Sequence, residues 1–333
     1  FLLRCVVSAV LIAYVARSVD WTALGLLLRR VAPGWVLLGS ALTPLLIATL
    51  TIRWRIFLRQ QRIQSSFSEL FSLTWAGQFF NSILPGSTGG DVVKIYQLCR
   101  VAPDRKAAAA ATVVADRLAA LMALLLMAAI AFVVDPLPLR LLSDQQVSIG
   151  AFTILMVMLA MCGGLIGWLL LRRFRSTQLV GRIGRTLAAA KNNLGFNLTS
   201  LAAFAVSLGL HGLNFFIFYC FAQALNVTIS YGQVLLMMPV LFFLVMMPVT
   251  INGHGLRELL LIGYFTHMGV TAAGQPGIAV QEIAVGVSLL GVANELLWSI
   301  PGGVWYLMRR PSREPRESSA MKSVDVSSPS WEK

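Results

Sequence analysis

A proline, three glycines and two charged side chains occur together in residues 81–96, which read NSILPGSTGGDVVKIY. Pro85 is expected to end one helix, and the spacing of Thr88 and Asp91 is typical of a capping box that opens the next. A glycine-rich helix start presents N–H groups and the positive end of the helix dipole, which favours a phosphate or carboxylate. A plain turn between two helices is the alternative, and the Asp91 carboxylate competes with an anion for the cap. The candidate binding residues here are Asn81, Pro85, Gly86, Ser87, Thr88, Gly89, Gly90, Asp91 and Lys94.

A second stretch, residues 248–258, repeats this order of features and reads PVTINGHGLRE. An apolar helix, a proline, small polar residues and glycines precede a helix that carries a basic residue and a carboxylate. Two segments interrupted by Pro and Gly in the two halves of a chain indicate the central site of a transporter. His254 is a candidate proton acceptor or substrate contact, with a local hydrogen-bonding role as the alternative. The candidate residues of this stretch are Thr250, Asn252, Gly253, His254, Gly255, Arg257 and Glu258.

Three further charged residues, Asp116, Arg117 and Glu295, lie inside long apolar segments. Asp116 is ten residues beyond Lys106, about 15 Å along a helix, which is near the middle of a hydrocarbon core roughly 30 Å thick. Charges at that depth are costly in lipid, so these side chains should face protein or a wet cavity. The alternative for Asp116 and Arg117 is a structural ion pair that joins two helices. For Glu295 we expect Arg117 or Arg257 as the partner.

The elements that must position these residues follow from the composition. Of the 333 residues, 57% are apolar and only 12% are charged, and the mean hydropathy is +0.75. Such a chain cannot cover itself with polar surface, which excludes a soluble enzyme, a disordered protein and an ordinary nucleic-acid-binding protein. The predicted fold class is an all-α, polytopic integral membrane protein with about seven or eight transmembrane helices and one or two re-entrant or broken helices.

The expected membrane domain is a single unit over residues 1–310, followed by a disordered cytoplasmic tail over residues 311–333. Two short apolar stretches, 69–84 and 255–268, suit re-entrant or broken helices. Because the first residue is Phe1, we expect a short N-terminal piece to be missing from the sequence. The predicted spans are 1–16, 35–51, 107–134, 148–171, 200–222, 233–249 and 281–308.

The net charge of +13 marks the orientation in the membrane. With the N-terminus inside, 21 of the 27 Lys and Arg fall in predicted cytoplasmic segments and four in outer ones, which leaves Arg117 and Arg257 in apolar segments. An excess of Lys and Arg marks the cytoplasmic side. We therefore expect a multi-pass protein of the cytoplasmic (inner) membrane with both termini inside, anionic phospholipid or lipid-linked glycan as partner, and no nucleic-acid partner.

Neither a cofactor nor a metal is expected. The four cysteines are isolated from one another in the sequence, and no Walker loop, nucleophile elbow or HExxH pair occurs in a suitable context.

The motifs NSILPGSTGGDVVK (81–94), ADRL (115–118) and MPVTINGHGLRE (247–258) together resemble the lysylphosphatidylglycerol synthase transmembrane family, also called flippase-like or dolichol-phosphate-glucose-synthetase-like proteins. The resemblance runs from residue 1 to about residue 310. It implies a polytopic inner-membrane protein whose two broken-helix elements meet at a central cavity. In lipid-modifying members this part is associated with moving an aminoacylated phospholipid between leaflets. We find no soluble aminoacyl-transferase or glycosyltransferase domain in the chain, and expect no such activity from it.

The leading hypothesis is a lipid translocase that moves a phospholipid or lipid-linked head group across the bilayer. In this hypothesis Lys94 and Arg257 are counter-charges to the phosphate, while Asp116, Glu258 and Glu295 hold Arg117 and the broken helices in place. One alternative is an intramembrane lipid-modifying transferase with Asp91, His254 or Glu258 as base. Another is a non-catalytic membrane partner of a separately encoded lipid synthase.

Overall fold

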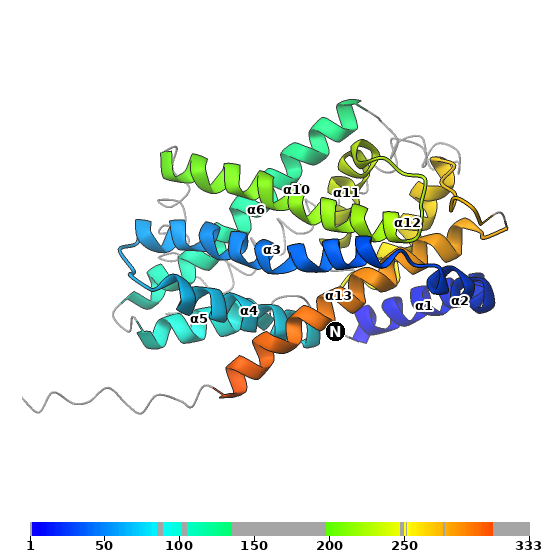
Figure 1. Cartoon of the computed structure of the whole chain (residues 1–333). Coiled ribbons are helices and arrows are strands. Elements are labelled where there is room, and N and C mark those ends of the chain that lie inside the picture. The colour runs from blue at the N-terminus through cyan, green and yellow to red at the C-terminus, as the bar shows by residue number, and fades with distance from the viewer. Residues whose placement is uncertain are drawn as a thin grey trace, which may run out of the picture.

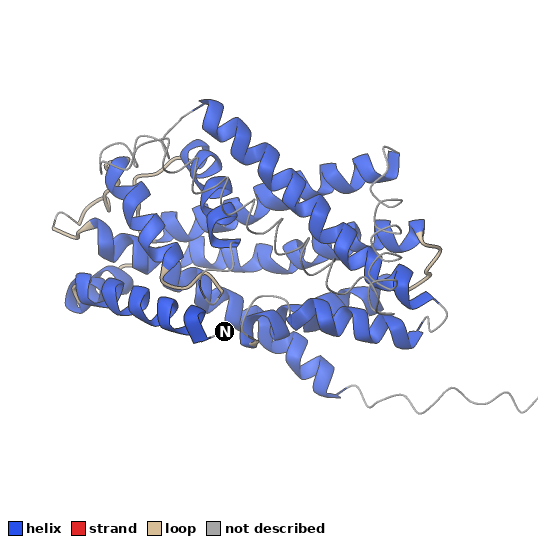
Figure 2. Ribbon diagram, turned by 180° about the vertical axis from the view of Figure 1, so that it is seen from behind, coloured by secondary structure: helices blue, strands red, loops and turns tan. Residues whose placement is uncertain are grey.

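A computed structural model describes residues 2–84, 89–101, 105–134, 198–246, 250, 252–275 and 277–308. These residues form helices, and no strand occurs among them apart from one isolated bridge between Val227 and Ala272 (Figure 2). The all-α prediction is confirmed. The helices are α1 (Leu2–Ser18), α2 (Trp21–Arg29), α3 (Pro33–Gln60), α4 (Phe67–Ile83), α5 (Gly89–Val101), α6 (Lys106–Val134), α10 (Leu198–Ala224), α11 (Tyr231–Met246), α12 (Leu256–His267) and α13 (Val280–Met308).

Four of the described helices, α3, α6, α10 and α13, are long and apolar enough to cross a membrane. The pair α1 and α2, bent by 79° at a short break, gives a fifth candidate span. Asp20 fixes the position of this break, because its side chain caps the start of α2 by accepting from the Thr22 and Ala23 N–H groups. The helix α11 is apolar but shorter. The predicted span 148–171 and the predicted tail 311–333 lie outside the described residues.

The helices α4 and α5 form a hairpin that starts and ends at the same end of the bundle. Figure 1 shows the two helices side by side, with α3 alongside α4. The Arg105 Nη1 group, just before α6, donates to the Gln61 carbonyl after α3 at 2.9 Å. One buried cluster joins the end of α3, the start of α4, the end of α5 and the start of α6; it contains Trp54, Leu58, Ile63, Leu70, Leu73, Leu98, Ala109 and Val113. This return to the starting end agrees with the re-entrant helix predicted around residues 69–84.

Small residues allow α4 to pack closely on both neighbours. A Cβ atom on Gly90 would lie 2.1 Å from the Gly77 carbonyl oxygen, so α5 approaches the α4 backbone as only glycine permits. On the other side, a Cβ atom on Gly302 of α13 would lie 2.3 Å from the Trp75 carbonyl oxygen. Trp75 Nε1 also donates to the Trp298 carbonyl. The hairpin is therefore held against α13.

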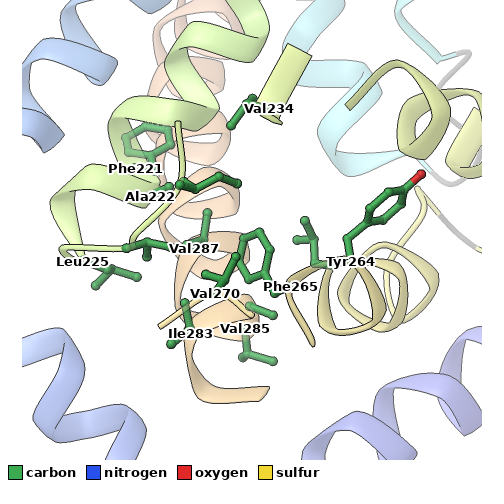
Figure 3. Packing of buried hydrophobic residues seen from close by; sticks show 14 of the residues in the cluster. Phe221, Ala222, Leu225, Val234, Tyr264, Phe265, Val270, Ile283, Val285 and Val287 are labelled. Atoms are coloured by element: carbon green, nitrogen blue, oxygen red, sulfur yellow. The ribbon is translucent and has the colours of Figure 1, made fainter. Parts of the chain in front are cut away.

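The larger apolar core lies among the C-terminal helices and α2. Phe221 and Ala222 from α10, and Leu225 directly after it, lie beside Ile283, Val285 and Val287 from α13 (Figure 3). Phe265 from α12 and Val270 after it belong to the same buried cluster. The first motif thus belongs to the α4–α5 hairpin and the second to the connection between α11 and α12.

Candidate functional site

Asn81, near the end of α4, connects the rest of the first motif to the second motif. Its Oδ1 atom accepts from the Gly90 N–H group at the start of α5, at 2.8 Å. Its backbone carbonyl accepts from Asn252 Nδ2, in the loop before α12, at 3.4 Å. The next residue, Ser82, donates its hydroxyl to Glu295 Oε1 of α13 at 3.3 Å. We call Asn81, Ser82, Gly90, Asn252 and Glu295 the Asn81 cluster.

The Asn252 loop adopts a backbone that few side chains tolerate. Asn252, Gly253 and Gly255 have φ values of 52°, 77° and 83°, all in the left-handed region. A Cβ atom on Gly253 would lie 2.2 Å from Val245 Cγ1, and one on Gly255 would lie 2.7 Å from Leu11 Cβ of α1. These glycines therefore let the loop fit between α11 and α1.

Glu258 fixes the start of α12. Its Oε2 atom accepts from the Gly255 N–H group at 2.7 Å, which is the half of a capping box that the residue three positions after the N-cap supplies. Its Oε1 atom accepts from Arg257 Nη2 at 2.8 Å and from the Ser288 hydroxyl of α13. The carboxylate thus ties α12 to α13, and Arg257, predicted as a counter-charge for substrate, already has a protein partner.

Five charged side chains lie close together on α3, α5 and α6. Arg53 pairs with Asp116 through two hydrogen bonds of 2.7 and 3.0 Å. Arg117 pairs with Asp91 through two bonds of 2.8 and 3.0 Å. The Lys94 Nζ atom lies 5.0 Å from the Trp54 ring centroid. Lys94 also interacts electrostatically with all four of the paired charged side chains. We call these five side chains the Lys94 charge cluster. Its three cations and two carboxylates leave one excess positive charge.

Two sequence-based expectations about charge were wrong. Arg53 was placed beyond the end of the predicted span 35–51, but α3 continues to Gln60, and Arg53 is buried at 3% exposure. Asp116 therefore pairs with a residue that the sequence reasoning missed. Glu295 contacts neither Arg117 nor Arg257 in the described structure; both arginines pair with carboxylates nearer to them in the sequence. The available signal for Arg53 was that Asp116 lies deep in an apolar segment, where a carboxylate needs a cationic partner, and that Arg117 follows it directly in the sequence and so points to another side of the helix.

An apolar cavity of about 240 Å³ lies between α1, α12 and α13. Its polar lining comes from His254, Glu258 and Ser288, and apolar side chains such as Val15 and Leu289 cover most of the rest. The second motif thus faces the Asn81 cluster through Asn252 and this cavity through His254.

The remaining predicted residues are placed as follows. Thr250 is buried at 6% exposure, and its hydroxyl has no hydrogen-bond partner within the described parts of the chain. Gly89 is the first residue of α5. Pro85, Gly86, Ser87 and Thr88, which were predicted to bind an anion, lie outside the described residues. Within the described residues, no group of three or more His, Cys, Asp or Glu is arranged to hold a metal ion.

Comparison with known proteins assigns the family. The family model described as lysylphosphatidylglycerol synthase TM region matches residues 1–281. The chain belongs to this family. The match spans both motif elements and ends at the start of α13. Membership in the lysylphosphatidylglycerol synthase TM region family indicates a membrane protein with a function related to membrane lipids.

A curated relative supports the same assignment. A UPF0104 membrane protein of Methanothermobacter thermautotrophicus is 33% identical over 91 residues. The match covers 27% of this chain and 27% of that relative, so most of the length of the relative is not matched. No solved structure matches the chain.

Proposed function

We propose that the chain binds the phosphate-bearing head group of a membrane lipid at the Asn81 cluster and transfers it between leaflets. The supporting observation is the pair of hydrogen bonds by which Asn81 joins Gly90 of the first motif to Asn252 of the second. Interrupted helices that meet inside a membrane bundle are the arrangement in which transporters hold a polar group in an apolar surrounding.

The Lys94 charge cluster supports an anionic ligand. The two ion pairs of this cluster engage both of its carboxylates, Asp91 and Asp116. Among the described residues, Lys94 therefore has no ion pair of its own. An excess charge within an apolar bundle is costly unless it meets an opposite charge. A lipid phosphate next to Lys94 would supply that charge. The sequence carries no nucleotide-binding motif, so transfer would follow a gradient or equilibrate the leaflets.

The transferase alternative has weaker support. A general base needs a carboxylate or imidazole free to take a proton from substrate. Asp91 and Glu258, two of the three candidate bases, form ion pairs with Arg117 and Arg257. His254, which lines the apolar cavity, is the remaining candidate. A covalently altered lipid in extracts of overproducing cells would favour the transferase.

We also propose that the protein resides in the cytoplasmic membrane with both termini inside, on the charge distribution of the sequence. As a partner we propose an anionic phospholipid or lipid-linked glycan. A separately encoded synthase as a partner is the remaining alternative. Affinity purification that recovers a soluble enzyme in stoichiometric amount would favour that alternative.

The test is reconstitution in liposomes with head-group-labelled lipid and a membrane-impermeant quencher that reports leaflet exchange. We expect Lys94→Gln to slow exchange at least several-fold, because it removes the excess positive charge. Lys106→Gln is the matched control, since Lys106 is exposed at the start of α6 and the change is chemically the same. Equal exchange by the wild type, Lys94→Gln and protein-free liposomes would overturn the translocase proposal.

A further inference from the structure

A second concave surface lies at the end of α3, away from the Asn81 cluster. Three arginines, Arg55, Arg59 and Arg62, line a cavity of about 790 Å³ together with Ser66 and Glu69. Ser66 caps the first turn of α4, whereas Asn81 lies fifteen residues later. At 1.5 Å per residue this places the cavity about 22 Å from the Asn81 cluster along α4. The two are therefore separate places in the molecule.

The backbone that carries these arginines is fixed. After the last turn of α3, Arg62 takes a left-handed conformation with φ of 54°. The N–H group of Ile63 donates to the Leu58 carbonyl at 3.0 Å, which closes a helix-ending turn. Ile63 is buried, and Arg105 donates to the Gln61 carbonyl. Arg55 and Arg59 thus project from the end of α3, and Arg62 projects from the ordered turn after it.

Within the described parts of the chain, the positive charges of this cavity outnumber the negative ones. No described carboxylate forms an ion pair with Arg55, Arg59 or Arg62, whereas Arg53, two residues before the first of them, is paired with Asp116. Glu69 also lines the cavity, so three guanidinium groups meet one carboxylate. A positive potential remains at the membrane end of α3 and α4.

We propose that this arginine cavity binds the phosphate group of an anionic phospholipid at the membrane face where α3 ends. Guanidinium groups bind phosphate oxygens through paired hydrogen bonds. Basic pockets between transmembrane helices, at the level of the head groups, are suited to anionic lipids. The site does not depend on the proposed transfer function, because its ligand need not cross the membrane.

The test measures lipid binding to the purified full chain in a neutral detergent. Phosphatidylglycerol is titrated, and bound lipid is counted by native mass spectrometry, with phosphatidylcholine as the uncharged comparison. We expect Arg59→Gln/Arg62→Gln to weaken phosphatidylglycerol binding roughly 30-fold, because each basic residue near an anionic lipid surface contributes an affinity factor of roughly five. Arg29→Gln/Arg30→Gln is the control, since both residues are exposed at the end of α2. Equal weakening in the two double variants, or none in either, would overturn the proposal.

Two further arms identify the source of the phosphate and exclude misfolding. Stabilisation of the wild type by phosphatidylglycerol but not by inorganic phosphate supports a lipid site. Stabilisation by inorganic phosphate, with no added effect of the lipid, would overturn the lipid assignment. Arg59→Lys/Arg62→Lys keeps the charge and should retain binding in part. If this Lys variant lost phosphatidylglycerol binding as completely as the Gln variant, while its melting temperature without ligand stayed unchanged, charge would not be what drives binding.

Discussion

The carboxylate of Asp116 and the guanidinium of Arg53 face each other in parallel, with Nε–Oδ1 and Nη2–Oδ2 distances of 2.7 and 3.0 Å. Arg53 Nη1 also donates to the Ser207 hydroxyl at 3.3 Å. Three helices, α3, α6 and α10, therefore share one buried polar contact. Paired and hydrogen-bonded charges can be retained inside an apolar bundle, whereas a lone charge there is costly.

Arg53→Gln and Asp116→Asn are each expected to destabilise the protein strongly. Each leaves one buried charge without its partner, which costs about 3–5 kcal/mol. The double variant Arg53→Met/Asp116→Leu, which removes both charges, should be more stable than either single variant. Thermal unfolding in detergent measures all three. If the double variant loses as much as the two single variants together, the two residues do not interact.

Gly90→Ala is expected to separate α4 from α5. The new Cβ atom would lie 2.1 Å from the Gly77 carbonyl oxygen, a backbone atom that cannot yield without moving the helix. The hydrogen bond from the Gly90 N–H group to Asn81 should weaken at the same time. Gly209→Ala is the matched control, because nothing lies within 4 Å of that position in α10. The control should be neutral or stabilising by up to about 1 kcal/mol. Melting temperatures that change equally in both variants would contradict the close packing.

Asn252→Gly is expected to separate the role of the side chain from that of the backbone. Glycine adopts the φ of 52° without strain, so the fold should persist while the bond to the Asn81 carbonyl is lost. Leaflet exchange in liposomes should then fall several-fold at nearly unchanged melting temperature. Asn252→Val, a β-branched residue that resists positive φ, should lower the melting temperature as well. Full exchange by Asn252→Gly would show that the side chain is not needed.

Glu258→Gln and Glu258→Ala are expected to differ in stability. The Gln side chain keeps an oxygen that can accept from the Gly255 N–H group, whereas Ala loses that hydrogen bond at a typical cost of about 1 kcal/mol. Both variants remove the charge that pairs with Arg257. Unfolding in detergent should therefore rank wild type above Gln above Ala. The reverse order of Gln and Ala would argue against the capping role.

The long apolar segments predicted most of the helices, because a helix that spans the bilayer needs about 20 apolar residues and few other patterns look like it. The prolines and glycines likewise indicated where α4 ends and where α12 begins. Pairing between helices was not predictable in the same way. Depth along a helix follows from counting residues, but the direction in which a side chain points does not. Glu295 was placed deep and given an arginine as partner, yet it contacts Ser82.

Arg53 shows a second reason why the pairing between helices could not be predicted from the sequence. The predicted span ended at residue 51 because Arg53, Arg55 and Arg59 lower the local hydropathy, and boundaries from hydropathy are uncertain by a few residues. A buried arginine is invisible to a scale that treats every arginine as a surface residue. Its partner on α6 lies 63 residues away in the chain, beyond the reach of any local pattern.

The close packing of α4 against Gly90 on one side and Gly302 on the other has a mechanical consequence. Backbone-to-backbone contacts leave no side-chain layer that could absorb sliding, so the hairpin and α13 must move as one rigid body. The second motif is joined to α13 as well, because the Glu258 carboxylate at the start of α12 accepts from the Ser288 hydroxyl of that helix.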